Sequence, residues 1–340
     1  MMRYLLSLLL LSVFVKLDAQ VDQPAEPLPI DTTRDNVLER ANNFLTKRYQ
    51  RKNFDTIYLE RPPYSFTVKL RANFSGSGIE THGLYEGDTY LTNLETPNRV
   101  TASVGLSYRG VSIGFALNPG KLSGRDKDME FNIAFYANRY GVDAAYQDAR
   151  TYRGWSEVND VRQSIPADLL HSRLLSASAY YVFNYRRFSY PAAFTQSYIQ
   201  RRSAGSPMLA LILLGGEIVA HTDETEEQSS MKIRIGNLGL GGGYGYNWVL
   251  PHRWMIHGSA LPAFVVASIN RLTLDGQQQK MPYSFPELML TERIAVTHDF
   301  NSQHFLALNF VITHSLFGNP NRLRISYNKW RLRLCYGFRF

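Results

Sequence analysis

The chain has 340 residues, of which 44% are hydrophobic and 19% charged, and its formal net charge is +8 at pH 7. The surplus of Lys and Arg is spread along the sequence and forms no clustered module, which argues against a nucleic-acid partner. The single cysteine, Cys335, excludes an intrachain disulfide and a cysteine metal site. We expect no metal and no cofactor.

The first residues are typical of a secretory signal peptide. Arg3 precedes an apolar run from Leu5 to Val15, and Ala19 is a small residue placed where cleavage would occur. Such a run is too short to span a bilayer. We therefore predict that residues 1–19 are removed and that the mature chain passes through the periplasm, with a retained membrane anchor as the alternative.

Residues 20–60 are expected to form a periplasmic N-terminal segment. Asp35 is suited to cap a helix, and apolar residues follow it at helical spacing. These are Val37, Leu38, Ala41, Phe44 and Leu45. The pattern predicts a short amphipathic helix that packs in the periplasm or against a barrel mouth, or else binds a partner.

From Tyr64 to the end, apolar residues alternate with small or polar ones, which is typical of strands. Residues 100–108 and 111–117 alternate on either side of Gly110 and predict a hairpin. The same rhythm returns in residues 131–135, 142–146, 175–183, 238–248, 254–266, 288–297 and 305–316. No later stretch approaches the roughly 18 apolar residues of a spanning helix, so a membrane location requires strands.

The C-terminal residues point to the same fold. Trp330, Leu332, Leu334, Tyr336, Phe338 and Phe340 face one way, and Arg331, Arg333 and Arg339 face the other. In a barrel, lipid meets the apolar face while arginine points into a polar lumen. The candidates for lining the lumen are Arg109, Arg139, Arg331, Arg333 and Arg339. The terminal Phe340 resembles the signal read by the outer-membrane assembly machinery.

These patterns predict an all-β fold, with residues 61–340 forming a transmembrane antiparallel β-barrel. We expect about 12 strands, within a range of about 10 to 14, because a closed bacterial barrel needs an even number. The strand assignment is weakest between Tyr185 and Ser206, where the alternation of short turns and long loops fails.

Several blocks of sequence carry a family resemblance. They include Tyr108-Arg109-Gly110-Val111, Asn118-Pro119-Gly120-Lys121, Pro191-Ala192-Ala193-Phe194 and Gly243-Tyr244-Gly245-Tyr246. In these blocks the chain resembles the domain of unknown function 4421 family of Bacteroidetes outer membranes, from about Asp55 to the end. The resemblance implies an outer-membrane barrel and implies no chemistry.

The motifs of soluble enzymes are absent from the sequence, including Gly-x-Ser-x-Gly and His-Glu-x-x-His. His257 and Ser259 share one strand face, and His298 or His304 could approach them. Side chains at that spacing lie about 7 Å apart, too far for a nucleophile-to-base hydrogen bond. This separation favours a polar lumen wall, and no catalytic residue is predicted.

Three functions remain open for a protein in the cell outer membrane, where lipid and lipopolysaccharide are the expected partners. The first is a narrow pore, whose cationic lumen would favour small anionic solutes. The second is a structural membrane protein that contacts a partner through the loop at 148–168. The third is a barrel enzyme acting on lipid or lipopolysaccharide.

Overall fold

The computed structural model describes residues 39–40, 42–43, 46–47, 49–50, 53–85, 87–109, 111–117, 120, 124, 128–221, 230–274, 276–281, 283, 285–318 and 323–340. The chain divides into two units, residues 1–48 and 49–340. The predicted signal peptide and the apolar positions of the predicted N-terminal helix, Val37, Leu38, Ala41, Phe44 and Leu45, lie outside the described residues. In the described part of the chain, no helix is long and apolar enough to cross a membrane.

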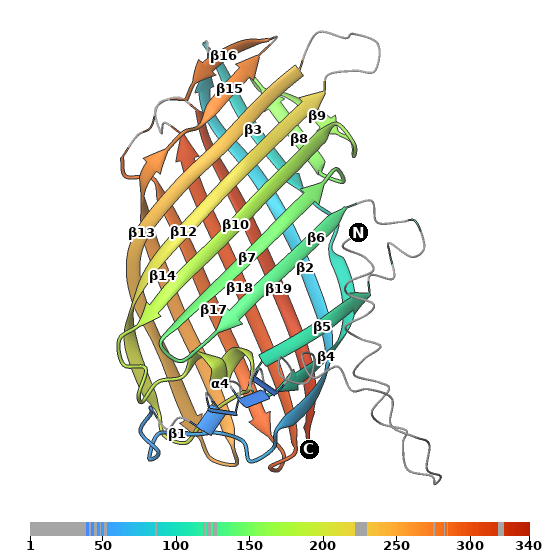
Figure 1. Ribbon diagram of the computed structural model, residues 1–340. Helices are drawn as coiled ribbons and strands as arrows, with labels where there is room; N and C mark the ends of the chain where they lie inside the picture. The colour runs from blue at the N-terminus through green and yellow to red at the C-terminus, as the bar shows by residue number, and fades with distance from the viewer. Residues whose placement is uncertain are drawn as a thin grey trace, which may run out of the picture. The chain divides into compact units, whose positions relative to one another are not determined.

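Strands dominate the second unit (Figure 1). The first ten are β1 (Leu59–Glu60), β2 (Phe66–Tyr85), β3 (Asp88–Glu95), β4 (Arg99–Tyr108), β5 (Val111–Leu117), β6 (Met129–Tyr136), β7 (Tyr140–Ala149), β8 (Arg153–Val158), β9 (Val161–Ile165) and β10 (Leu170–Val182). After helix α4 (Tyr190–Phe194) come β11 (Ile199–Gln200), β12 (Ala204–His221), β13 (Ser230–Leu250), β14 (Trp254–Ser268), β15 (Arg271–Leu274), β16 (Gln277–Lys280), β17 (Leu288–Asp299), β18 (His304–Gly318) and β19 (Leu323–Arg339).

Antiparallel pairing leads around the sheet and back to its start. It runs from β2 through β19, β18, β17, β14, β13, β12 and β10 to β7. The strand of β7 continues as β8, which pairs with β3, and β3 pairs with β2. This ring of pairings makes an antiparallel barrel, as the sequence predicted. Among the described residues no pairing joins β5 to β6, so the ring runs through β3 and β8 and leaves a seam between β5 and β6.

Several labelled strands are parts of one longer strand. Both β3 and β4 pair with β2 and are separated by residues 96–98, and both β14 and β15 pair with β13. Interrupted strands counted once give β2, β3/β4, β5, β6, β7/β8, β9/β10, β12, β13, β14/β15, β16/β17, β18 and β19. These twelve among the described residues agree with the expected number.

The two faces of the wall have the polarity of a transmembrane barrel. Large apolar side chains such as Leu70, Phe131 and Ile294 are more than half exposed on the outside. Lys69 and Arg293 face inward and are buried. A soluble protein has the opposite arrangement.

Aromatic residues lie at the strand ends near the short turns and the C-terminus. They include Phe66, Tyr108, Trp248, Trp254, Phe338 and Phe340. Figure 1 shows this end of the barrel, with the C-terminus marked. Aromatic girdles of this kind lie at membrane interfaces, and short turns are periplasmic in outer-membrane barrels. We call this end the short-turn end and the other the long-loop end.

Side chains fill the lumen in successive layers. The inward-facing residues of β2 contact these layers one after another along the strand. At the short-turn end, Lys69 Nζ donates to the carbonyl of Thr195, which belongs to the segment between β10 and β12. Farther along β2, the Ser75 hydroxyl donates to Glu130, one of a set of largely buried charges. Ile79 belongs to an apolar cluster toward the long-loop end, which also holds Leu94, Leu174, Ile212, Leu214, Ile218, Ile233, Val265, Met289, Phe317 and Ile325.

The charges between these two regions form what we call the ionic layer. It consists of Arg99, Asp128, Glu130 and Lys329. Arg99 bridges Asp128 and Glu130, each at 3.2 Å, and Lys329 reaches Glu130 at 3.2 Å. Each carboxylate therefore has a cationic partner, as burial of charge requires.

Candidate functional site

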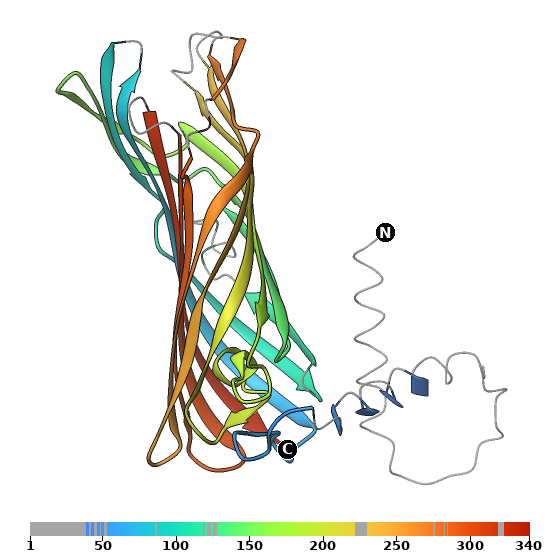
Figure 2. The same ribbon diagram turned by 90° about the vertical axis from the view of Figure 1, so that its left-hand side faces the viewer.

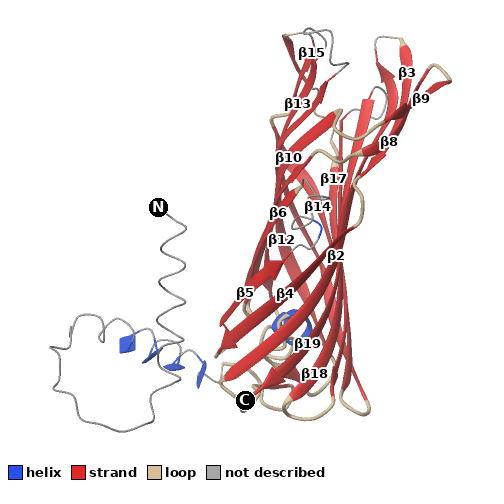
Figure 3. Cartoon of the chain, turned by 90° about the vertical axis from the view of Figure 1, so that its right-hand side faces the viewer, coloured by secondary structure: helices blue, strands red, loops and turns tan. Residues whose placement is uncertain are grey.

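Residues 184–203, which we call the plug, connect β10 to β12 by folding into the lumen at the short-turn end (Figures 1 and 2). Its helix α4 begins after Ser189, whose hydroxyl accepts a hydrogen bond from the Ala192 amide, and Pro191 lies in the first turn. Helix α4 contacts β6, β14, β17 and β18, and Figure 3 shows it surrounded by strands. This inward fold explains why the alternation of turns and loops failed here.

Aromatic packing and one lysine hold the plug in place. Phe188, Tyr190 and Phe194 are buried, and their rings pack around the imidazole of His257. On the β2 wall, Lys69 Nζ donates to the Thr195 carbonyl at 2.7 Å, just after α4 ends. Most surfaces of α4 are thus covered by the barrel.

A chain of hydrogen bonds links the plug to the wall and fixes the orientation of Asn247. Gln200 Nε2 donates to the carbonyls of Arg187 (2.6 Å) and Arg202 (2.9 Å), so its Oε1 is the acceptor. Asn247 Nδ2 donates to that Oε1 at 2.9 Å and to the Ser189 carbonyl at 3.0 Å. Asn247 Oδ1 must therefore point the other way.

The orientation of Asn247 decides the tautomer of the neighbouring histidine. Asn247 Oδ1 lies 2.7 Å from His257 Nδ1, which therefore carries the proton. His257 Nε2 is then an acceptor, and Ser259 Oγ lies 3.1 Å from it. The Tyr190 hydroxyl lies 2.6 Å from Ser259 Oγ and donates to it, because Ser259 gives its own proton to the imidazole.

Ser259, His257 and Asn247 thus have the geometry of a nucleophile, a base and a group that orients the base. The expectation that His257 and Ser259 lie too far apart is wrong. The imidazole of His257 extends along the strand toward the residue two positions on, so the ring nitrogen approaches Ser259 much more closely than the strand spacing suggests. The other two histidines are engaged elsewhere, His298 stacked on Trp254 and His304 bonded to the Tyr336 hydroxyl.

Arg293 lies opposite Ser259 on β17 and also faces the lumen. It is 1% exposed, and its Nη2 donates to Asp143 at 2.8 Å and to Ser178 at 3.1 Å. Its Nε and Nη1 have no hydrogen-bond partner among the described residues. A buried cation with two unused donors is suited to bind an anion or a developing negative charge.

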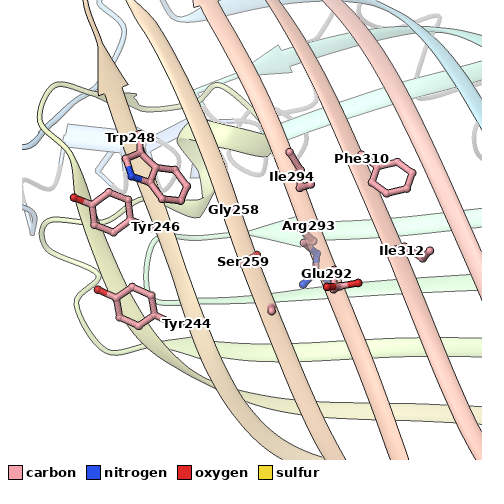
Figure 4. Close-up of a pocket in the computed structure, with 11 residues that line it drawn as sticks. Tyr244, Tyr246, Trp248, Gly258, Ser259, Glu292, Arg293, Ile294, Phe310 and Ile312 are labelled. Carbon is pink, nitrogen blue, oxygen red and sulfur yellow. The ribbon is translucent and has the colours of Figure 1, made fainter.

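The same stretch of wall has a depression of about 550 Å³ on its outer face, shown in Figure 4. Tyr244 and Trp248 from β13 and Ile294 from β17 rise around Gly258, which has no side chain. The hydrogen-bonded chain of Asn247, His257 and Ser259, which we call the relay, therefore lies behind a hollow in the outer, apolar surface.

The five arginines predicted to line the lumen fall into two groups. On the inner face of β19, Arg331 bonds Asn132 (2.9 Å), Arg333 bonds Asn73 (2.7 Å) and Arg339 bonds Asp299 (2.8 Å). Arg109 and Arg139 lie instead in the turns after β4 and β6, where Arg139 donates to the Tyr181 hydroxyl. A role for any of them in solute passage stays a prediction.

Phe340 stacks between Phe66 and Phe338 at the short-turn end. Its role as an assembly signal also stays a prediction. Sequence reasoning missed Asn247, Tyr190 and Arg293 as members of the site.

Comparison with curated proteins finds no match. Among solved structures, the chain is similar to the outer membrane protease OmpT from Escherichia coli, with 7% identity, a TM-score of 0.42, and coverage of 85% of this chain and 100% of that one. It is also similar to the translocator domain of the autotransporter NalP from Neisseria meningitidis, with 10% identity, a TM-score of 0.32, and coverage of 90% and 96%. For the toluene transporter TodX of P. putida, the identity is 9%, the TM-score 0.28, and the coverage 82% and 91%. The model of the family described as Domain of unknown function (DUF4421) matches residues 53–340, and the chain belongs to that family.

Proposed function

We propose that the protein is a resident barrel of the cell outer membrane, reached after signal-peptide cleavage, whose filled lumen does not conduct solutes passively. The observation that carries this proposal is the occupied lumen. The plug, the ionic layer and the apolar cluster follow one another along the barrel axis. Of the functions left open by the sequence, this arrangement disfavours a narrow pore for anionic solutes. It favours a structural membrane protein, or one that carries a binding or catalytic site in its wall.

A charged network on the outer face supports the membrane location. His171 bonds Asp148 at 2.7 Å, and Glu217 bridges Arg173 at 3.5 Å and Lys232 at 2.6 Å. These residues lie on β7, β10, β12 and β13, nearer the long-loop end than the exposed apolar side chains of the same strands, such as Val142, Leu175 and Leu211. Paired charges just beyond an apolar band match the headgroup level of a bilayer, where we propose that lipopolysaccharide contacts the wall.

Single-channel recording in planar bilayers tests the closed lumen. Wild-type protein, shown to be folded by heat-modifiable migration on a gel, is expected to give no conductance steps where a known porin gives them under the same conditions. A matched variant in which a short Asn-Gly turn replaces residues 184–203 should also stay silent, since the ionic layer and the apolar cluster remain. Steady conductance of the wild type would contradict the proposal.

A further inference from the structure

We propose that Ser259 is the nucleophile of a hydrolytic site for carboxylic esters with apolar acyl groups, which α4 covers in this structure. The proposal goes beyond the closed barrel, because a silent lumen neither requires nor excludes chemistry at the wall. It rests on the relay from Asn247 through His257 to Ser259 and on the position of Arg293.

The proton positions in the relay are those that base catalysis needs. Two backbone carbonyls fix the amide orientation of Gln200, and Gln200 and Ser189 together fix the amide orientation of Asn247. Asn247 in turn determines which nitrogen of His257 carries the proton. The Nε2 lone pair is thereby directed at Ser259 Oγ. A side chain that only fills space would not require this orientation to be fixed from so many sides.

Arg293 supplies the second requirement, a donor for the charge that develops on the ester oxygen. Its Cα is the direct cross-strand partner of Ser259, so both side chains leave the wall at one level and on one side. The bonds to Asp143 and Ser178 use Nη2, which leaves Nε and Nη1 unpartnered in a buried position. Such a donor stabilises an oxyanion strongly because little water competes for it.

The surroundings of Ser259 determine the class of acyl group. Phe188, Tyr190 and Phe194 of the plug and Tyr180 of the wall form the apolar cover over the relay. If Tyr190 and Phe194 swing away, their places become an apolar space directly beside Ser259 Oγ. Gln200 lies outside α4, so its Oε1 can still hold Asn247 Nδ2 when the helix moves, whereas Ser189 caps α4 and its carbonyl bond to Asn247 depends on the helix.

The reaction then proceeds in two balanced steps. Ser259 Oγ bonds to the ester carbonyl carbon while its proton moves to His257 Nε2. The carbon–oxygen ester bond breaks, and the leaving alcohol takes that proton. Water repeats the sequence in the second step, with Nε2 accepting its proton and returning it to Ser259 as the carboxylic acid departs.

Labelling with a fluorophosphonate probe, which reacts with activated serines, tests the site in the full-length folded barrel. The variant Tyr190→Ala/Phe194→Ala opens the cover, and it should react at least tenfold faster than the wild type. Lys69→Met releases Thr195 without touching the relay and should also speed labelling. It serves as the second opened form if the double variant does not fold.

Further substitutions in an opened form identify the reacting groups. Ser259→Ala should abolish labelling, and His257→Gln should slow it about a hundredfold or more. Ser172→Ala, which changes another buried serine bonded to Tyr152, is the matched control and should have no effect.

Asn247 is a positioning residue, because it acts through His257. Asn247→Leu should slow labelling about tenfold. Asn247→Asp keeps an acceptor for Nδ1 but loses both donations from Nδ2, so it should restore only part of the rate. Hydrolysis of p-nitrophenyl butyrate should follow the same order of variants. Labelling that survives Ser259→Ala, or folded opened forms that neither label nor hydrolyse the ester, would overturn the proposal while leaving the closed lumen untouched.

Discussion

Removal of the Asp143 carboxylate tests whether water reaches the lumen wall. The side chain of Arg293 is 2% exposed and pairs with Asp143 at 2.8 Å. Breaking one side of a buried ion pair destabilises a protein by about 3–5 kcal/mol, because the remaining charge stays buried without its partner. Arg293 keeps its bond to Ser178, so we expect Asp143→Ala to lower the free energy of unfolding by about 3 kcal/mol.

The double variant Asp143→Ala/Arg293→Met separates the unpaired charge from other effects of the substitution. Methionine removes the buried cation and fills much of its volume, so part of the lost stability should return, about 2 kcal/mol. The Tyr136 hydroxyl, which also donates to Asp143, loses its acceptor in both variants and accounts for the part that does not return.

Urea unfolding of the barrel in detergent or lipid vesicles, followed by tryptophan fluorescence, measures both changes. The comparison needs reversible unfolding and equal denaturant slopes for all variants. If Asp143→Ala lies within about 0.5 kcal/mol of the wild type, water solvates Arg293. The lumen would then be hydrated at this level, and the argument for a filled barrel would fail.

Three further outcomes are expected. Glu130→Gln leaves two buried cations of the ionic layer with a weaker partner and should destabilise the barrel by about 2–3 kcal/mol in urea, whereas Glu80→Gln at an exposed position should change it by less than about 0.5 kcal/mol. Gly337→Ala would place a methyl group 1.9 Å from the Phe305 ring, so it should lower the midpoint of unfolding, and Phe305→Ala in the same chain should recover part of the loss. Phe340→Ala should reduce the amount of folded protein in isolated outer membranes, measured by heat-modifiable migration, without changing the urea midpoint of the fraction that folds.

The sequence predicts the strands well where one face of the wall meets lipid. Residues 100–108 and 305–316, for example, alternate because their outward side chains lie in an apolar medium and their inward ones do not. Residues 148–168 were expected to be a loop, yet they contain the hairpin of β8 and β9. Both faces of that hairpin carry polar side chains, such as Glu157, Arg162 and Gln163, so no two-residue rhythm marks it.

The plug escaped prediction for a different reason. Its buried residues belong to a five-residue helix and to irregular chain, so they follow neither strand nor helix periodicity over a useful length. The sequence shows only that short turns and long loops do not alternate between residues 185 and 206. In a barrel, a break in this alternation means that one connection on the short-turn side is too long to be a tight turn. The lumen is the nearest space into which such a connection can fold.

The relay was partly accessible from the sequence. Pro251 and His252 stand between the predicted strands at 238–248 and 254–266, and a hairpin that closes there pairs Leu250 with Trp254. Counting back from that pair places Asn247 opposite His257, on the inward face of both strands. The cross-strand partner of Ser259 was not accessible, because β15, β16 and their loops separate β14 from β17 in the sequence and leave the register of Arg293 undetermined.

The order of the layers along the axis bears on which functions the barrel can support. A solute crossing the membrane would have to displace the plug, separate the paired charges of the ionic layer and pass the apolar cluster. Access to Ser259 requires only that α4 moves, since Tyr190 covers the hydroxyl from the plug side. A rearrangement confined to one short helix costs far less free energy than opening three layers in series. The geometry therefore favours binding or reaction at Ser259, near the short-turn end, over solute transit through the barrel.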